Sequence, residues 1–387
     1  MPDLTLGQIE GVLDDLQSRH MAVMRERCAR QRHRLSACRR CLDVCPTGAI
    51  AWEDGLQIDW DRCQRCGACA TVCPTGALEP RLPSNDEIWV QAGRAAGERG
   101  WVGFACSRAT LPEGAGQELI HTNCLARLDE SLLMGVIAYG ARSVWLVAGA
   151  CETCPLGSAR AAVERVVHRA GALLAALGRP ACIELGTCLP PDLATGAGGQ
   201  EAADQGVGGV SRRGLFKTLA RETARASASA RAWREAATPA PSPAGEDGLP
   251  TALPDKRLML MAALERLGRP AEPCFEAGED GLWAGLEFTA DCTACQMCTF
   301  FCPTGALIKA AHEDRAGVVY QVSRCVNCNL CRDLCYRQAV VLRGHVDLGQ
   351  VMSGGIELLS VRRVESAAPW QGVSQERVAS AILDSLG

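Results

Sequence analysis

Two cysteine-rich stretches, Cys38–Cys73 and Cys292–Cys335, constrain the fold of this chain more than any other feature. The clearest run is Cys63-Gln-Arg-Cys66-Gly-Ala-Cys69-Ala-Thr-Val-Cys73, in which three cysteines are separated by two residues each and a fourth follows after three more. The second stretch contains this spacing twice. Three thiolates on one such loop reach three corners of an iron–sulfur cluster, whereas the fourth serves the other cluster of a pair. We therefore expect iron–sulfur clusters in both stretches.

Disulfides and zinc are the two other uses of dense cysteines. A disulfide framework requires an oxidising compartment, and we expect no secretory signal peptide in the N-terminal residues. A structural zinc site takes four ligands as two separated C-x2-C pairs, whereas each stretch here holds seven or eight cysteines. The spacing instead resembles that of bacterial two-cluster ferredoxins, and this resemblance implies two 4Fe-4S clusters in each stretch.

The ferredoxin pattern assigns three complete sets of ligands. In the second stretch, one set is Cys292, Cys295, Cys298 and Cys335, and the other is Cys325, Cys328, Cys331 and Cys302. In the first stretch, the complete set is Cys63, Cys66, Cys69 and Cys45. Each set combines three cysteines of one loop with a fourth from the partner motif, so each pair of clusters is predicted to form together.

The fourth set lacks one cysteine. Its members are Cys38, Cys41 and Cys73, and Leu35 stands where the spacing predicts the first ligand. Cys28 is the nearest spare thiol, and the longer loop to it adds only a modest closure entropy. We therefore predict that Cys28 is the replacement ligand. A three-iron cluster, or Cys28 as a lone structural cysteine, is the alternative.

Residues 88–191 have a different pattern, in which apolar strands alternate with helices. Strands are predicted at Trp101–Ala105, Ser143–Ala148 and Ala181–Leu185, and helices at Leu132–Tyr139 and Ala159–Leu177. This alternation predicts a small parallel α/β domain. Ligands gather at the carboxyl ends of strands in such sheets. Cysteines are expected there, namely Cys106, Cys151 and Cys154, with Cys124 before the first helix and Cys182 and Cys188 around the last strand.

This middle segment contains Phe104-Ala105-Cys106, Asn123-Cys124-Leu125-Ala126-Arg127-Leu128-Asp129, and Gly140-Ala141 before the strand that ends Gly149-Ala150-Cys151-Glu152-Thr153-Cys154. In these motifs it resembles the delta subunit of methyl-viologen-reducing hydrogenases, which passes electrons between a hydrogenase and a heterodisulfide reductase. The resemblance implies a 2Fe-2S cluster at Cys106, Cys124, Cys151 and Cys154. The last pair is closer together than in that family, and a second cysteine near Cys106 is absent. A zinc site and unligated thiols therefore stay open as alternatives.

These features predict a fold of mixed class, α+β and α/β, in which two bacterial-ferredoxin-like modules flank a small parallel α/β domain. The predicted segments are an N-terminal helix (1–27), a first two-cluster ferredoxin domain (28–87), the α/β domain (88–191), a linker with a basic helix (192–256), a second two-cluster ferredoxin domain (257–350) and a tail ending in a helix (351–387). Aromatic residues make up only 4% of the chain, so the ferredoxin-type domains are expected to depend on bound clusters for stability.

Composition excludes several classes of function. The formal net charge of -4 gives no nucleic-acid signature, and no apolar run approaches the length of a membrane helix, so we expect neither nucleic-acid binding nor an integral membrane protein. No glycine-rich dinucleotide motif follows a strand, so no flavin or NAD is expected. We expect a cytoplasmic protein, because free thiolates persist in a reducing compartment. A basic helix at 212–225 is a candidate for peripheral docking to a partner or a membrane surface.

The resulting functional prediction is an electron-transfer subunit. Four 4Fe-4S clusters, with or without one 2Fe-2S cluster, would relay single electrons between redox partners such as a hydrogenase, a formate dehydrogenase or a reductase within a larger complex. We find no nucleophile–base pair, so no catalytic site of its own is expected. The alternative is a ferredoxin-type accessory or maturation factor for a molybdenum or other metallo-oxidoreductase. Cys182, Cys188 and Cys274 have no assigned role.

Overall fold

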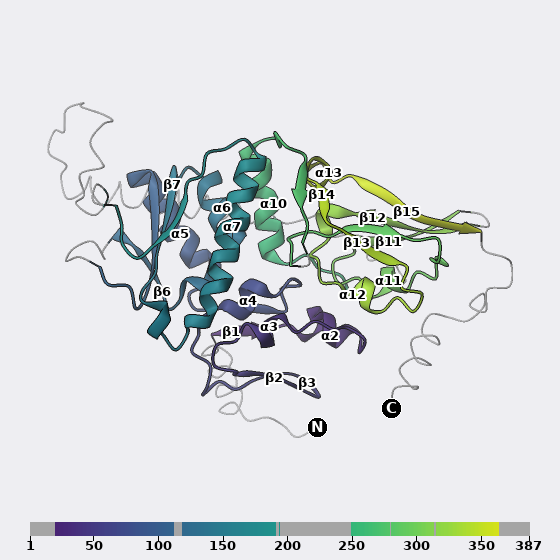
Figure 1. The fold of residues 1–387 in the computed structure, drawn as a ribbon, viewed down its shortest axis with the longest axis horizontal. Coiled ribbons are helices and arrows are strands. Elements are labelled where there is room, and N and C mark those ends of the chain that lie inside the picture. The colour runs from purple at the N-terminus through teal and green to yellow at the C-terminus, as the bar shows by residue number, and fades with distance from the viewer. Residues whose placement is uncertain are drawn as a thin grey trace, which may run out of the picture.

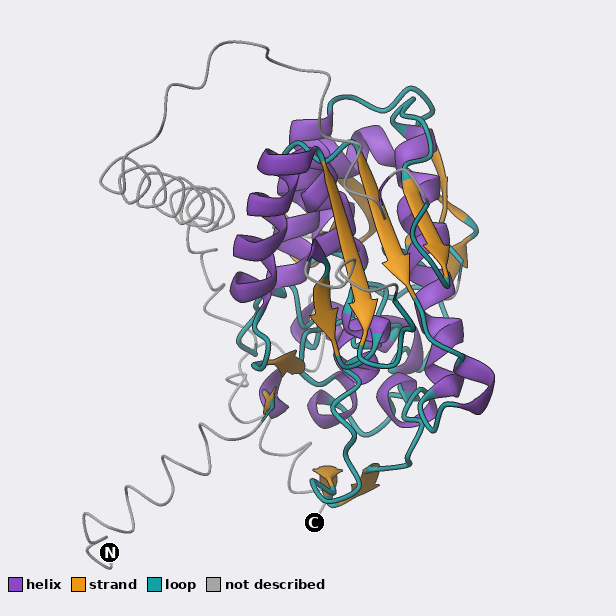
Figure 2. Ribbon diagram, turned by 90° about the vertical axis from the view of Figure 1, so that its left-hand side faces the viewer, coloured by secondary structure: helices purple, strands orange, loops and turns teal. Residues whose placement is uncertain are grey.

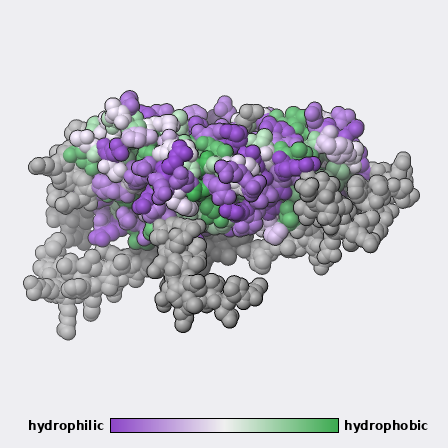
Figure 3. All heavy atoms as spheres, turned by 90° about the horizontal axis from the view of Figure 1, so that it is seen from below, coloured by the Kyte–Doolittle hydropathy of each residue, from purple (hydrophilic) through white to green (hydrophobic). Residues whose placement is uncertain are grey.

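The computed structural model describes residues 20–111, 118–190, 193, 249–278, 280–312 and 315–363. The three main parts of the chain are a first block (residues 20–80), an α/β unit (84–190) and a second block (274–363). Figure 1 shows the α/β unit on the left, the first block beneath it and the second block on the right. Seen from below, the described surface is mostly hydrophilic, with smaller hydrophobic patches (Figure 3).

The α/β unit contains a four-stranded parallel sheet, as the alternation of strands and helices predicted (Figure 2). The strand order is β6 (Ile120–Thr122), β5 (Trp101–Cys106), β7 (Ser143–Val147) and β8 (Ile183–Gly186). The helices are α5 (Asn85–Arg99), α6 (Glu130–Ala138) and α7 (Arg160–Ala176). Neither α5 nor β6 was predicted. The apolar pattern of α5 is weak and β6 is only three residues long, so neither gave a clear signal in the sequence.

Local sequence explains where these elements begin and end. Helix α5 starts at a reciprocal capping box between Ser84 and Glu87 and ends at Gly100, which adopts a φ of 72°. In β5, Val102 and Phe104 belong to the large core on the helix-covered face, whereas Trp101 and Ala105 belong to a smaller cluster on the other face. The sheet is therefore buried on both faces at its centre, as parallel sheets require.

The first block consists of two antiparallel strand pairs and short helices. Strand β1 (Met21–Val23) pairs with β4 (Leu78–Pro80), and β2 (Ile50–Glu53) forms the expected hairpin with β3 (Gly55–Ile58). Its helices are α2 (Ala29–Arg32), α3 (Arg40–Asp43) and α4 (Ala68–Val72), preceded by a 3-10 turn at Arg25–Arg27.

The second block repeats this pairing. Strand β10 (Gly285–Phe288) pairs with β13 (Val340–Arg343), and β11 (Leu307–His312) forms a hairpin with β12 (Arg315–Gln321). A third strand, β15 (Ile356–Arg363), pairs with β12, and β9 (Cys274–Glu276) pairs with β14 (His345–Asp347). The helices are α11 (Met297–Phe300), α12 (Leu330–Asp333) and α13 (Leu348–Ser353). The outer pair and central hairpin recur in both blocks, as expected of an internal repeat.

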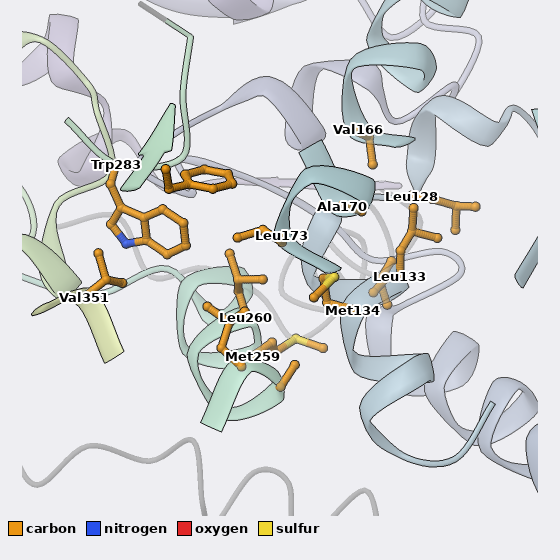
Figure 4. Packing of buried hydrophobic residues seen from close by; sticks show 14 of the residues in the cluster. Leu128, Leu133, Met134, Val166, Ala170, Leu173, Met259, Leu260, Trp283 and Val351 are labelled. Atoms are coloured by element: carbon orange, nitrogen blue, oxygen red, sulfur yellow. The ribbon is translucent and has the colours of Figure 1, made fainter. Parts of the chain in front are cut away.

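Helix α10 (Asp255–Leu267) joins the α/β unit to the second block. It packs against α6, and it buries Met259, Leu260 and Leu264. Figure 4 shows Leu173 of α7, Leu260 of α10 and Trp283 facing one another. Trp283 is completely buried, so one continuous hydrophobic core extends from the sheet into the second block.

Three features differ from the predicted segments. Residues 21–23 form strand β1 instead of the end of the predicted N-terminal helix, because they pair with the chain returning after Cys73. Strand β15 continues the second block beyond residue 350, since β12 provides it with a partner. Helix α10 lies against α6, not within the second block alone. Residues 1–19, the basic helix predicted at 212–225 and the helix predicted near the C-terminus lie outside the described residues.

Among the described residues, none of the helices has the combination of length and apolar character needed to cross a membrane.

Candidate iron–sulfur centres

The three complete C-x2-C-x2-C loops share one backbone conformation. In each, the residue before the second cysteine and the residue before the next helical turn are left-handed, with φ between 51° and 78°. These residues are Arg65 and Gly67, Ala294 and Gln296, and Asn327 and Asn329. Successive backbone N–H groups in such a loop form a concave surface that favours negative charge. A thiolate-ligated cluster carries such charge, so the loop geometry fits it.

The loop that lacks a first cysteine has a different conformation. Arg39, which occupies the position of Gly67, has a φ of -129°. Leu35 points to solvent, with 53% of its surface exposed. The missing ligand and the changed backbone therefore occur together in one loop of four.

A second backbone feature recurs after the last cysteine of each motif. The third residue after it is left-handed in all four cases: Gly48, Gly76, Gly305 and Gln338, with φ of 58°, 63°, 65° and 51°. This turn brings a main-chain N–H back to the sulfur in two motifs, from Ala49 to Cys45 Sγ at 3.3 Å and from Ala339 to Cys335 Sγ at 3.4 Å. Hydrogen bonds to ligand sulfur tune the potential of a cluster.

Two of the predicted ligand sets each surround a cavity. One cavity is lined by Cys45, Cys63, Cys66 and Cys69, together with Leu156 and Arg127. The other is lined by Cys292, Cys295, Cys298 and Cys335. Both cavities match the predicted sets, although they combine cysteines from separate motifs. The donor set is all thiol, which suits an iron–sulfur cluster.

The thiols of the other two sets lie close enough to one another to affect the pKa of Cys41 and Cys331. Burial, together with the neighbouring thiols of Cys73, Cys38 and Cys28, raises the pKa of Cys41 to about 12. Burial likewise raises the pKa of Cys331, with contributions from its neighbours Cys328, Cys325, Cys298 and Cys302. Cys28 therefore lies within the group that its predicted role requires. Its ligation stays a prediction.

Raised pKa values mean that these thiols keep their protons at neutral pH when nothing is bound. Metal binding must then displace protons, and its free energy contributes to folding. Within the described ranges, no group of three or more His, Cys, Asp or Glu side chains is arranged as the ligands of a single metal ion.

A further group of cysteines lies at the carboxyl edge of the parallel sheet. The N–H of Gly149, after β7, donates to Cys106 Sγ at 3.1 Å. Burial raises the pKa of Cys124, and the nearby thiols of Cys66, Cys106 and Cys151 contribute to its value of about 11. The N–H of Cys154 donates to the oxygen of Cys151, and Cys154 Sγ accepts from the N–H of Leu156. The structure thus brings Cys106, Cys124 and Cys151 together, with Cys154 one turn away.

Three cysteines have no assigned role. Cys182 precedes β8 and is at the amino end of the sheet, where its main-chain oxygen accepts from Val144. Cys188 and Cys274 are exposed to solvent. None of the three is adjacent to a predicted ligand in the sequence.

The α/β unit contacts the first block beside its cysteines. Thr71 Oγ1 donates to the oxygen of Ala126 at 2.7 Å, and the side-chain amide of Asn123 donates to the oxygen of Gln64. Gln64 lies between Cys63 and Cys66, and Asn123 precedes Cys124. The central cysteines and the nearest set of the first block therefore share one interface.

The two blocks contact each other in the same way. Arg40 Nη2 donates to the oxygen of Asn327 at 2.9 Å, and the N–H of Ala37 donates to Asp333 Oδ2 at 2.8 Å. The ring of His33 packs edge-on to Phe301, with centroids 4.7 Å apart. Sequence reasoning missed these residues. Their only signal was their position, because most lie inside or directly beside a cysteine motif.

Comparison with known proteins identifies one match. A family model described as a 4Fe-4S binding domain (Fer4) matches residues 56–79, which include Cys63, Cys66, Cys69 and Cys73. No curated protein and no solved structure match the chain. The match supports a ferredoxin-type iron–sulfur protein that holds a 4Fe-4S cluster and has a role in electron transfer.

Proposed function

We propose that this chain is a multi-cluster electron-transfer subunit, of the polyferredoxin type, with four 4Fe-4S clusters at sixteen cysteines. The sixteen are Cys28, Cys38, Cys41, Cys73, Cys63, Cys66, Cys69, Cys45, Cys292, Cys295, Cys298, Cys335, Cys325, Cys328, Cys331 and Cys302. The observation that carries the proposal is the contact of Arg40 and Ala37 with Asn327 and Asp333, since it joins two cysteine-rich blocks through their ligand loops.

The four ligand sets can be placed in a series. Cys69 lies near Cys41, which links the two sets of the first block. Cys328 lies near Cys38, which links the blocks. Cys331 lies near Cys298, which links the two sets of the second block. Clusters bound at these positions would supply one-electron oxidation and reduction.

The chain itself holds and shields these centres. Cys298 and Cys73 are buried, and Ala68, beside Cys69, has no exposed surface, whereas Cys295 is exposed, so water is kept from part of the predicted ligand shell. N–H groups such as that of Ala49 donate to ligand sulfur. Both features set reduction potential, because it depends on solvent exposure and on hydrogen bonds to sulfur.

Iron analysis tests the proposal directly. Protein purified without oxygen is expected to contain roughly sixteen to eighteen iron atoms per chain, from four cubanes with or without a two-iron centre. Matching acid-labile sulfide and reversible EPR signals on redox titration complete the test. Zinc in place of iron, or cystine bridges at Cys63–Cys73 and Cys292–Cys302, would refute the proposal.

We propose that the partners of this chain are redox enzymes. A hydrogenase, a formate dehydrogenase or a reductase would exchange electrons with the chain, and a 2Fe-2S cluster at Cys106, Cys124, Cys151 and Cys154 would extend the series. The contact of Asn123 with Gln64 supports this extension. We further propose that the chain has no catalytic site of its own. Copurification of the native protein, followed by identification of its companions, tests the partner class.

One observation favours a second function, that of an accessory or maturation factor. The first loop has neither its regular first cysteine nor the left-handed backbone of the other three. A labile cluster there would suit delivery or assembly for another metalloenzyme. Stable association with a mature redox enzyme supports electron transfer, whereas transient binding to an immature apo-enzyme supports the second function.

A further inference from the structure

A cavity of ≈ 420 Å³ lies where the first block, the α/β unit, α10 and the second block meet. This volume falls in the range of small-molecule sites, and none of the predicted cysteine ligands lines it. The first turns of three helices do. Glu130 and Ser131 come from α6, Ala161 and Ala162 from α7, and Lys256 and Arg257 from α10.

Only one of these three helices begins with neither a side-chain cap nor a preceding helical turn. Helix α6 is capped by Asp129, whose carboxylate accepts from the N–H of Leu132. Helix α7 continues from a 3-10 turn at Gly157–Ala159, and the N–H of Arg160 donates to the oxygen of Gly157. Helix α10 begins after Pro254, which supplies no side-chain hydrogen bond, so its first N–H groups and the helix dipole favour an anion at this end.

Arg257 provides an independent indication of a ligand. Its side chain lines the cavity, is 5% exposed and stacks on the Trp283 ring, with the guanidinium carbon 4.5 Å from the ring centroid. One nitrogen, Nη2, donates to the oxygen of Leu282. The buried Nε and Nη1 find no hydrogen-bond partner in the described part of the chain. Cys325 and Glu130 lie close enough to influence the charge of Arg257, but neither accepts a hydrogen bond from Nε or Nη1. Leaving buried charged donors without a hydrogen bond is costly, so this geometry favours an acceptor supplied from outside the protein.

The carboxylates around the cavity already have partners. Asp280 pairs with Arg40 at 3.5 Å, Glu130 with Arg169 at 3.1 Å and Asp43 with Arg39 at 3.3 Å. Asp129 accepts from the Ser131 hydroxyl and the Leu132 N–H.

Three of the cations that line the cavity form no ion pair with these carboxylates. Lys256 donates to the oxygens of Ala70 and Thr71, and neither Arg165 nor Arg257 forms an ion pair with a described carboxylate. Asp129 forms no ion pair with a described side chain either, so the five lining cations exceed the four lining carboxylates by one charge.

We propose that this cavity binds a small phosphate-bearing anion. A phosphate group presents several oxygens in different directions, which suits donors that come from an arginine edge and from the first turn of α10. Val44 and Pro74 of the first block and Val326 of the second also line the cavity. These residues adjoin Cys45, Cys73 and Cys325, so a bound anion would contact the backbone beside ligand sets of both blocks. The binding itself does not depend on the proposed electron transfer.

Calorimetric titration of the full-length, cluster-loaded protein in phosphate-free buffer tests this site. Inorganic phosphate and ADP are the two phosphate probes, and citrate is the comparison. Saturable binding of one ADP or one phosphate per chain is expected. Similar affinity for both probes indicates free phosphate as the ligand, and much tighter binding of ADP indicates a nucleotide. No saturable binding of either, or binding of citrate alone, would overturn the proposal.

Two variants and one control locate the binding. Arg165→Gln removes an exposed arginine of the cavity and is expected to weaken binding about tenfold, as the loss of one charge-assisted contact does. Arg257→Gln is expected to weaken it at least as much. Arg160→Gln, on the same helix but paired with Glu164 outside the cavity, should bind as the parent does. Because Arg165 is exposed, Arg165→Gln is expected to fold, so it measures the effect on binding even if Arg257→Gln fails to fold. Unchanged affinity in Arg165→Gln would overturn the proposed location.

Discussion

Arg40 Nη2 donates a hydrogen bond of 2.9 Å to the main-chain oxygen of Asn327. Arg40 lies between Cys38 and Cys41, and Asn327 lies between Cys325 and Cys328. Two ligand loops that are 287 residues apart in the chain are thus fixed to each other directly. The Arg40 side chain therefore helps to set the distance between these two loops, and mutation of Arg40 can test this role.

Replacing Arg40 by Gln is expected to destabilise the protein. Its guanidinium is largely buried and makes both the Asn327 contact and an ion pair with Asp280, so the loss should be about 1.5–3 kcal/mol. Arg39→Gln is the matched control, because Arg39 is exposed and its pair with Asp43 should contribute at most about 1 kcal/mol. Denaturant unfolding without oxygen measures both. Equal losses would contradict the importance of the Arg40 contact.

Gly67 is expected to tolerate no side chain. It has a φ of 78°, and a Cβ atom would lie 2.8 Å from Arg127 Cδ and 2.9 Å from Arg127 Cα. The backbone conformation alone costs an alanine about 1–2 kcal/mol, and the clash with the α/β unit adds to it. Gly67→Ala should therefore lower both stability and iron content.

Gly97→Ala provides the control for Gly67→Ala. Gly97 lies within α5, and a Cβ atom there would meet no other atom within 4 Å. This variant should gain about 0.5–1 kcal/mol, because alanine loses less backbone entropy in a helix. The unfolding temperature should therefore fall for Gly67→Ala and rise for Gly97→Ala, and the iron content should fall only for Gly67→Ala. A Gly67→Ala protein with parental stability would show that the loop can relax.

Cys28→Ala tests the atypical ligand set. Cys28 lies near Cys41, so its removal should lower the iron content by about one to four atoms per chain, depending on whether a three-iron cluster survives. Cys274→Ala is the control, since Cys274 is exposed in β9 and has no predicted role. Iron content that stays the same in both variants would mean that Cys28 is not a ligand.

His33 predicts a pH dependence of the contact between the blocks. Burial lowers its pKa below 6.5, and the charge of Arg34 lowers it further. The unfolded chain therefore binds the proton more readily, and the contribution of neutral His33, which packs against Phe301, is complete above 6.5 and declines as the pH falls toward the folded pKa.

Comparison with His33→Gln isolates this effect from the acid loss of clusters, which both proteins share. The stability difference between parent and variant should be constant from about pH 8 to pH 7 and should shrink between about pH 6.5 and pH 5. Unfolding midpoints measured across this range provide the test. A difference that does not change with pH would exclude a titrating role for His33.

Cysteine spacing predicted the grouping of the thiols that line two cavities, because three members of each set lie on one short loop whose conformation is local. The cavities at Cys45–Cys69 and Cys292–Cys335 agree with those predicted sets. The alternation of strands and helices likewise predicted the parallel sheet and the cysteines at its carboxyl edge. Helix periodicity was misleading at residues 21–23, since the strand there depends on pairing with Leu78–Pro80.

The sequence by itself determined which cysteines share a short loop, and it predicted iron–sulfur chemistry for them. Only the tertiary structure decided how the sets are ordered, that Cys28 lies near Cys41, and that three helix ends and Arg257 surround one cavity. The physical reason is the range of the interactions. Ligand loops form from neighbouring residues, whereas the contacts of Arg40 with Asn327 and of Arg257 with Leu282 depend on how whole elements pack around a shared core.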